Sequence, residues 1–225
     1  MAFAMTHPDV RAIVCARGGY GATRIVERLP WDEFRRSPKW IVGYSDVTAL
    51  HVECTRLGIA SMHGDNAGTM GSAAPGARLA WMNALEHGRM QSMPAPVVHA
   101  EGEVRGTLVG GNLSLLLAQA AEGRLAWPDD AIVAIEDIGE RPYRVDRMLQ
   151  ALLPRLQRSR GVLFGSFTDC LPNSDGVSVD DVIADFASRA QIPVYAGAPF
   201  GHGEHNRPLV FGSKVELGRQ GLRVL

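Results

Sequence analysis

The sequence predicts an α/β protein made of two α/β units, and two observations support this prediction. Short apolar runs rich in Val and Ile alternate with helix-like stretches along most of the 225 residues, which is typical of alternating strands and helices. A segment rich in Gly, Ala, Met and Pro interrupts this alternation between residues 64 and 100. We therefore predict an N-terminal unit at residues 1–98, with a linker from about residue 64, and a C-terminal unit at residues 99–225.

The first unit is predicted to alternate three buried strands with three helices. Its opening residues, Met1-Ala-Phe-Ala-Met, read as the last turn of an amphipathic helix, so we expect that further residues precede Met1 in the full protein. The strands are expected at 10–16, 40–43 and 59–63, and the helices at 24–29, 31–37 and 45–57.

The second unit repeats the alternation after a linker that carries one helix at 77–86. An apolar strand at 131–135 ends on Glu136 and Asp137, and Pro154 is expected to stop or kink the helix at 143–153. The other strands are expected at 102–109, 161–167 and 193–196, the other helices at 112–121 and 179–190, and a β-hairpin at 209–225.

The composition is that of a soluble globular chain and argues against several classes of function. A formal net charge of -1 gives no reason to expect a nucleic acid or an anionic membrane as partner. No apolar run is long enough to span a bilayer, and the N-terminus lacks the pattern of a secretory signal. Three cysteines without CxxC spacing argue against a disulfide framework and against a zinc site. These features together predict a cytoplasmic protein.

Ser45 follows a short buried strand, and a helix is predicted to begin directly at this serine. That is the arrangement of a nucleophile elbow, in which a sharp turn exposes the hydroxyl and the helix N-terminus aims backbone N–H groups at a developing oxyanion. The sequence lacks the second Gly of G-x-S-x-G, so spacing alone favours a simple N-cap of the helix as the interpretation of Ser45.

The loop Arg17-Gly-Gly-Tyr-Gly also lies between a strand and a helix, where α/β folds place their ligands. It matches neither a Walker sequence nor G-x-G-x-x-G, so we expect no nucleotide cofactor. Gly18 and Gly19 offer close backbone approach and free N–H groups, which suit an oxyanion hole or a substrate carboxylate. A tight structural turn is the alternative.

Two further segments carry side chains suited to proton transfer. Glu136 ends an apolar strand, as a histidine-orienting carboxylate does, although such an acid can also cap the next helix. His202 lies in the polar, glycine-rich loop that follows the strand at 193–196. His202 and His205 lack other ligands at a recognisable spacing, so no metal site is expected.

In combination these segments resemble the LD-carboxypeptidase family of serine peptidases, which has the microcin-immunity peptidases as a sister branch. The resemblance covers nearly the whole chain, from about Phe3 to Leu225, and family members carry several dozen further residues before the position of Met1. The matching stretches are Ala16-Arg-Gly-Gly-Tyr-Gly, Gly43-Tyr-Ser-Asp-Val-Thr-Ala-Leu, Gly110-Gly-Asn-Leu-Ser, Ile135-Glu-Asp-Ile-Gly-Glu-Arg-Pro-Tyr-Arg-Val-Asp-Arg-Met-Leu and Gly201-His-Gly.

The resemblance implies an incomplete flavodoxin- or Rossmann-like N-terminal domain and a C-terminal α/β domain, with the active site in the cleft between them. It implies Ser45 as nucleophile, His202 as general base and then acid, and Glu136 as the group that orients His202. Asp137 and Glu140 are weaker candidates for that carboxylate. The oxyanion hole would use the backbone N–H of Asp46 with one from Gly18 or Gly19, and Asn112 would line the cleft.

The resemblance also implies a small peptide substrate, a murein tetrapeptide that loses its terminal D-alanine during cytoplasmic peptidoglycan recycling. The family is typically homodimeric and needs no cofactor. Arg17 is a candidate for binding the terminal carboxylate, and a structural ion pair is its other interpretation. One alternative is a microcin-immunity-type peptidase that acts on peptidyl or aminoacyl nucleotide analogues. A second is a truncated, inactive relic of the fold.

Overall fold

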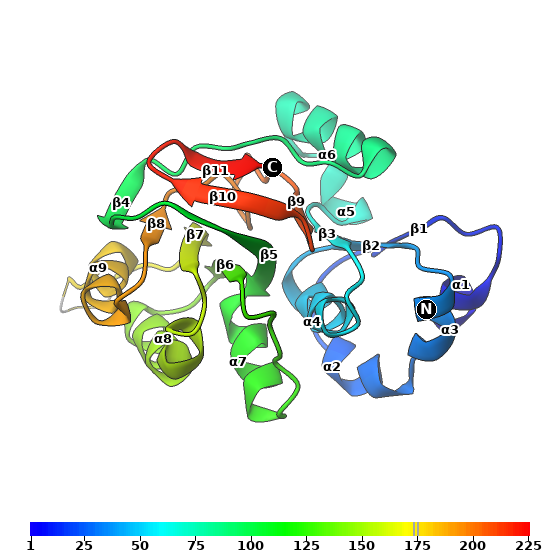
Figure 1. Cartoon of the computed structure of the whole chain (residues 1–225), viewed down its shortest axis with the longest axis horizontal. Coiled ribbons are helices and arrows are strands. Elements are labelled where there is room, and N and C mark those ends of the chain that lie inside the picture. Colours follow the sequence, from blue (N-terminus) through cyan, green and yellow to red (C-terminus); the bar gives the residue numbers. More distant parts are fainter. Residues whose placement is uncertain (173, 175) are drawn as a thin grey trace.

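The computed structural model describes residues 1–172, 174 and 176–225, and these residues form two neighbouring β-sheets with helices packed against them (Figure 1). The α/β class expected from the sequence is confirmed. The first sheet has the strand order β1-β2-β3-β9, and the second has the order β11-β10-β5-β6-β7-β8-β4. The assignment of separate domains at 1–98 and 99–225 stays a prediction.

The first sheet is parallel across β1 (Ala12–Val14), β2 (Trp40–Gly43) and β3 (Ser61–His63). Its last strand, β9 (Leu209–Phe211), pairs antiparallel with β3 although it comes from the far end of the chain. The helical segments of this part are α1 (Ala2–Thr6), α2 (Ala22–Ile25), η1 (Val26–Arg28), α3 (Trp31–Arg36), η2 (Ser45–Val47) and α4 (Thr48–Arg56).

The placement of β9 corrects the expectation of one hairpin over residues 209–225. Leu209, Val210 and Phe211 are all buried in a hydrophobic cluster that also contains Val42 and Met62 of the first sheet, and β9 pairs with β3 at the edge of that sheet. Only β10 (Lys214–Gly218) and β11 (Gly221–Val224) form the hairpin, at the edge of the second sheet.

The second sheet is parallel across β5 (Val104–Asn112), β6 (Ala131–Ile138), β7 (Gly161–Thr168) and β8 (Val194–Ala196). The edge strand β4 (Val97–Ala100) pairs antiparallel with β8. Helices α7 (Leu113–Ala121), α8 (Pro142–Leu156) and α9 (Val179–Ala190) cover one face of this sheet, and α5 (Ala67–Met70) and α6 (Pro75–His87) lie in the connection between the sheets (Figure 1).

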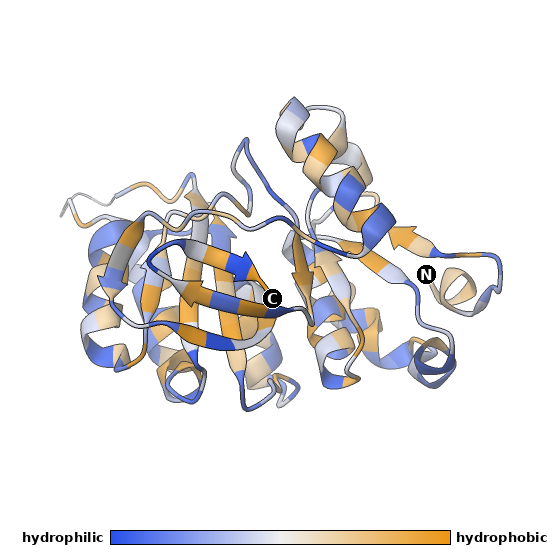
Figure 2. Cartoon of the chain, turned by 45° about the horizontal axis from the view of Figure 1, so that its top comes forward, coloured by the Kyte–Doolittle hydropathy of each residue, from blue (hydrophilic) through white to orange (hydrophobic). Residues whose placement is uncertain are grey.

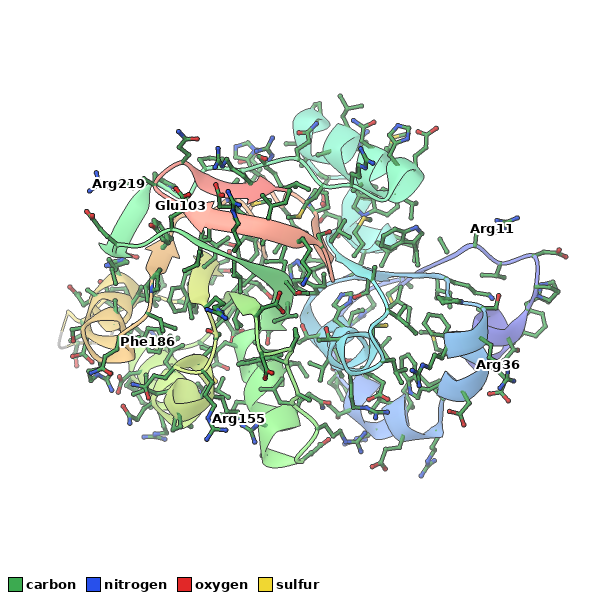
Figure 3. The ribbon with its side chains drawn as sticks, in the orientation of Figure 1. Arg11, Arg36, Glu103, Arg155, Phe186 and Arg219 are labelled. Carbon is green, nitrogen blue, oxygen red and sulfur yellow. The ribbon has the colours of Figure 1, made fainter. Side chains whose placement is uncertain are left out.

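The apolar strands of the second sheet form one core with these helices. Figure 2 shows apolar residues along the strands and hydrophilic residues on the outer faces of the helices. Phe186 of α9, labelled in Figure 3, makes an edge-to-face contact with Phe164 of β7 at 5.7 Å between ring centroids. Burial of the aliphatic face of α8, which includes Leu149 and Leu152, completes this layer.

Several element boundaries differ from the sequence-based expectations, and two of these differences concern Glu136 and Pro154. Strand β6 continues to Ile138, so Glu136 and Asp137 lie within the strand and not after its end. Helix α8 continues through Pro154 to Leu156, because a proline in the last turn removes only one donor close to where the helix ends. Among the described residues, no helix is long and apolar enough to cross a membrane.

Candidate active site

Ser45 lies directly after β2 and its backbone is held in the left-handed region, with φ 63°. A non-glycine residue pays conformational energy there, and such strain concentrates at functional sites. The short helix η2 begins at Ser45, its N-cap position is Tyr44, and no side chain caps it among the described residues. The serine hydroxyl is therefore not used as a helix cap, and the local geometry is that of a strained turn between a strand and a helix.

The glycine-rich loop approaches Ser45 through Gly18. A Cβ atom added at Gly18 would lie 3.0 Å from Oγ and 2.9 Å from Cβ of Ser45, so only glycine lets the loop backbone come this close. Gly19 is the next residue, with φ 112° and the Arg17 guanidinium beside it. The N–H of Gly18 or Gly19, predicted as one donor of an oxyanion hole, therefore belongs to a loop that approaches the serine closely.

Asp46 fixes the turn to the helix that follows the glycine-rich loop. Its Oδ2 accepts a hydrogen bond of 2.9 Å from the backbone N–H of Ala22, the first residue of α2. The side chain thus has a structural partner, and the role predicted for Asp46 concerned its backbone N–H. This bond holds the loop and the serine turn in a fixed relation.

His202 and Glu136 form the central contact of the site. His202 Nδ1 lies 2.6 Å from Oε2 of Glu136, and the side chain of Glu136 is fully buried. The tyrosine that precedes the serine, Tyr44, packs against the imidazole of His202 with 4.6 Å between ring centroids. Through Tyr44 the structure brings the loop of the histidine next to the turn of the serine.

The buried carboxylate of Glu136 is strongly favoured in its ionised form. Burial by itself raises its pKa, but the hydrogen bond with His202 and the neighbouring imidazole of His63 outweigh burial and lower the pKa to about 2. Glu136 is therefore charged throughout the physiological range. A charged carboxylate on Nδ1 fixes the imidazole tautomer and leaves Nε2 as the nitrogen that can exchange a proton with a hydroxyl.

Asn112 lies beside Glu136 in the sheet but faces a helix end. Its side chain is 2% exposed, and its Oδ1 accepts hydrogen bonds from the Ser114 hydroxyl and from the Leu115 N–H, which caps α7. Its Nδ2 donates to Oδ1 of Asp137 at 2.7 Å. The structure thus gives Asn112 a positioning role under the site, and a cleft-lining role stays a prediction.

The start of α4 packs against the glycine that precedes Asn112 in β5. A Cβ atom at Gly111 would lie 2.6 Å from the Thr48 hydroxyl, so this glycine admits the start of α4, the helix that follows the serine turn. The Thr48 hydroxyl accepts a 3.0 Å hydrogen bond from the Asn112 N–H. The Gly-Gly-Asn stretch therefore couples the serine turn to the sheet that carries Glu136.

Sequence reasoning missed the residues that hold the histidine loop. Asn206 is buried, its Oδ1 accepts from the Gly201 N–H at 3.0 Å, and its Nδ2 donates to Asp65 at 3.3 Å. His63, at the end of β3, lies 3.7 Å from Glu136 and was also missed. The signal for His63 was its position, because a polar residue that ends a strand beside β2 lies at the same sheet edge as Ser45.

The described residues contain no group of three or more His, Cys, Asp or Glu side chains placed to hold a metal ion. The candidate site combines a serine on a strained turn, a histidine paired with a buried carboxylate, and a glycine-rich loop that approaches the serine. This set of groups can carry out nucleophilic acyl transfer.

Comparison with known proteins connects both halves of the chain to one family. The LD-carboxypeptidase N-terminal domain matches residues 1–64, and the LD-carboxypeptidase C-terminal domain matches residues 105–217. The murein tetrapeptide carboxypeptidase of Pseudomonas aeruginosa is 33% identical over 232 residues, which cover 96% of this chain and 75% of that protein.

Solved structures give the same result. The muramoyltetrapeptide carboxypeptidase from Oxalobacter formigenes has a TM-score of 0.85 and 29% identity, over 97% of this chain and 79% of that one. An MccF-like protein from Bacillus anthracis has a TM-score of 0.84 at 21% identity, over 99% of this chain and 78% of that one, which shows a shared fold. The chain therefore belongs to the LD-carboxypeptidase family, a family of serine-type hydrolases.

Proposed function

We propose that this protein is a serine carboxypeptidase that releases the terminal D-alanine from murein tetrapeptides. The observation that carries the proposal is the 2.6 Å contact between His202 and the buried Glu136, next to a serine turn held at a positive φ. A serine hydroxyl is a poor nucleophile until a base removes its proton, and a base needs a third group to fix its tautomer. Ser45, His202 and Glu136 supply these three functions.

In the proposed reaction, His202 takes the proton of the Ser45 hydroxyl while Oγ attacks the carbonyl carbon before the terminal D-alanine. The carbonyl oxygen becomes an oxyanion, which the N–H groups of Asp46 and of Gly18 or Gly19 would stabilise. When the peptide bond breaks, His202 gives its proton to the leaving amine of D-alanine. Water then attacks the acyl-enzyme with His202 again as base, and the shortened peptide leaves with Ser45 restored.

The substrate class is supported by two features of different kinds. A relative with 33% identity is named a murein tetrapeptide carboxypeptidase, and a solved structure with 29% identity is named a muramoyltetrapeptide carboxypeptidase. Independently, the exposed Arg17 lies in the loop that contacts Ser45, and no acidic side chain forms an ion pair with it within 4.0 Å among the described residues. A guanidinium without an ion-pair partner, beside Gly19 in the loop that approaches Ser45, suits the free carboxylate of a substrate.

The test is release of D-alanine from a murein tetrapeptide by the wild-type chain and by Ser45→Ala. A matched control is Ser37→Ala, because Ser37 is exposed at the C-cap of α3 and lies outside the serine turn. We expect release by the wild type and by Ser37→Ala, and loss of at least about a thousandfold in Ser45→Ala.

Release that persists in Ser45→Ala would refute the assignment of the nucleophile. A folded wild-type chain that leaves the tetrapeptide intact but hydrolyses an aminoacyl sulfamoyl adenosine would replace the proposal by the microcin-immunity type of activity. The assignments to cytoplasmic peptidoglycan recycling and to a homodimer stay predictions from the sequence.

A further inference from the structure

Glu136 has a second neighbour that the proposed mechanism does not use. Its Oε2 pairs with His202, whereas its other oxygen, Oε1, faces Nε2 of His63 across 3.7 Å. The side chains of His63 and Glu136 are both 0% exposed. Among the described residues neither ring nitrogen of His63 has a hydrogen-bond partner, and neither does Oε1 of Glu136. Two unpartnered buried polar atoms, Nε2 of His63 and Oε1 of Glu136, thus face each other across one short gap.

This arrangement requires an explanation because unpartnered buried polar groups are costly. A buried carboxylate that keeps its charge needs donors for both oxygens, and His202 supplies only one. An imidazole N–H at Nε2 of His63 would face the remaining oxygen. The 3.7 Å separation is longer than a hydrogen bond, so the described contact is electrostatic and becomes a hydrogen bond after a shift of less than about 1 Å.

In the part of the chain that the structure describes, no other group donates a hydrogen bond to that oxygen. His51, with its ring 6.2 Å from that of His63, is occupied through both nitrogens, by the Ser61 hydroxyl and the Gly43 carbonyl. Phe200 and Phe211 contribute apolar ring faces. Tyr44 contacts the ring of His63 edge-on.

The remaining charged groups of the neighbourhood are acids. Asp137 follows Glu136 on β6, where its oxygens accept from Asn112, Ser114 and Ile138. Asp65, two residues after His63, accepts from Thr69 and Asn206. Neither acid can donate to Glu136 when ionised, so they add negative charge and increase the need for a donor at Oε1.

We propose that His63 is a positioning residue of the active site, which holds the free oxygen of Glu136 and offsets part of its charge. The carboxylate is then held from both sides, by His202 from the loop after β8 and by His63 from the end of β3. His63 thus acts on the reaction through Glu136 and His202, without touching the substrate. The proposal rests on the proposed function, since it assigns His63 to the same serine-histidine-glutamate machinery.

The consequence for catalysis has a defined direction. Without the His63 N–H, the full negative charge of Glu136 acts on His202 and stabilises the protonated imidazole. Because His202 must be neutral to accept the serine proton, the acidic limb of the kcat/KM profile should move to higher pH. Glu136 would also lose one of its two contacts, so kcat should fall while KM changes little.

The test compares His63→Phe, which keeps a flat ring without nitrogen, with His63→Gln, whose amide N–H can reach the position of Nε2. In His63→Phe we expect kcat to fall by about tenfold and the acidic limb to move up by about 0.5 pH unit or more. His63→Gln should retain kcat within about threefold and an acidic limb close to that of the wild type. A His63→Phe variant that is folded and has the wild-type profile would overturn the proposal.

A second measurement does not depend on activity or on the folding of a His63 variant. Long-range ¹H–¹⁵N spectra of histidine-labelled protein should show that Glu136→Gln shifts the ring resonances of both His63 and His202. The ring of His87, which is exposed on α6, serves as the internal reference that should not move. If the ring resonances of His63 do not move, the proposal for His63 is rejected, whether or not the protein has peptidase activity. If they move but no peptidase activity is found, the proposed function fails and the contact between His63 and Glu136 stands.

Discussion

Nδ1 of His202 lies 2.6 Å from Oε2 of Glu136, although the two residues are 66 positions apart and lie on different elements. The carboxylate is buried within β6, whereas the histidine lies on the loop after β8. The pair is thus formed by the tertiary fold and not by local sequence. This contact determines which ring nitrogen of His202 remains available, and the first prediction follows from it.

Replacement of Glu136 by Gln should abolish most of the activity without unfolding the protein. The amide would present an N–H₂ or a neutral oxygen to Nδ1, so the imidazole would lose its fixed tautomer and the charge that stabilises its protonated form. We expect kcat to fall by about 10³-fold to 10⁴-fold. The measurement is D-alanine release, with thermal denaturation as the check of folding.

The matched control for this variant is Glu140→Gln. Glu140 was a weaker candidate for the orienting carboxylate, and in the structure it forms an ion pair with Arg144 at 2.7 Å, after the end of β6. Its replacement should change kcat by less than about threefold, since its ion-pair partner is Arg144 and not His202. An equal loss in both variants would contradict the assignment of Glu136.

Addition of a methyl group at Gly18 should disturb the serine directly. The new Cβ would lie 3.0 Å from Oγ and 2.9 Å from Cβ of Ser45, which is tighter than ordinary contacts, so either the loop or the serine must move. We expect Gly18→Ala to lower kcat by about 100-fold, because a displaced nucleophile or oxyanion donor is costly. Steady-state kinetics of the folded variant would measure this.

Gly71→Ala is the control for this methyl group. Gly71 lies at the end of α5 with φ -64°, and a Cβ added there meets nothing within 4 Å. Kinetic constants within about twofold of the wild type are expected for this variant. A Gly18→Ala enzyme with full activity would show that the loop does not take part in the site.

Arg17 should contribute to substrate binding through the terminal carboxylate. Its guanidinium lies beside Gly19, in the loop that contacts the serine. Arg17→Gln should raise KM by about tenfold or more, with a smaller change in kcat, since a charge-assisted contact would be lost in both the ground state and the transition state. A tetrapeptide with an amidated C-terminus should show no such difference between the two enzymes.

Arg11→Gln provides the control for the lost charge. Arg11 is exposed before β1, at the outer end of the first sheet (Figure 3). Its replacement lowers the net charge by the same amount and should leave KM unchanged within about twofold. If both variants raised KM equally, general electrostatic attraction would explain the effect better than a carboxylate site.

The sequence was sufficient for the features that depend on local pattern. Buried strands such as 40–43 and helices such as 179–190 are visible as apolar periodicity, and the structure has β2 at Trp40–Gly43 and α9 at Val179–Ala190. The strand–serine–helix order at Ser45 is equally local. Its positive φ could not be read from the sequence, because Ser rarely adopts that conformation without support from the surrounding structure.

Features that depend on distant contacts were out of reach of pattern reasoning. The pairing of β9 with β3 joins residues about 150 positions apart, and nothing in the apolar triplet Leu209–Phe211 indicates which strand it joins. Asn206 acquires its role only when the loop after β8 folds against Asp65, and His63 acquires its role only when β6 brings Glu136 next to the end of β3. Because a buried histidine can belong to a core or to a site, only the position of His63 next to Glu136 indicates which of the two it is.

Asp137 should lower the free energy of unfolding as the pH rises, whereas a carboxylate with a lowered pKa has the opposite effect. Burial, assisted by the charge of Glu136, raises its pKa to about 6 against the hydrogen bonds from Asn112, Ser114 and Ile138. Because the folded pKa lies above the unfolded value, the folded state binds the proton more tightly, and this contribution to stability is lost as the pH rises through 6. The loss between pH 5 and pH 7 should be about 1 kcal/mol.

Chemical denaturation of the wild type and of Asp137→Asn at both pH values would isolate this effect. The pKa of the buried His51 is lowered to about 3, so His51 favours unfolding below pH 6.5 and changes stability in the opposite direction. This contribution is common to both proteins and cancels in their difference. Asn at position 137 has one acceptor oxygen for three donors, so the variant should be less stable at both pH values. The difference in free energy of unfolding between the wild type and Asp137→Asn should therefore be smaller at pH 7 than at pH 5. A difference that stays constant or grows would show that Asp137 is already ionised at pH 5.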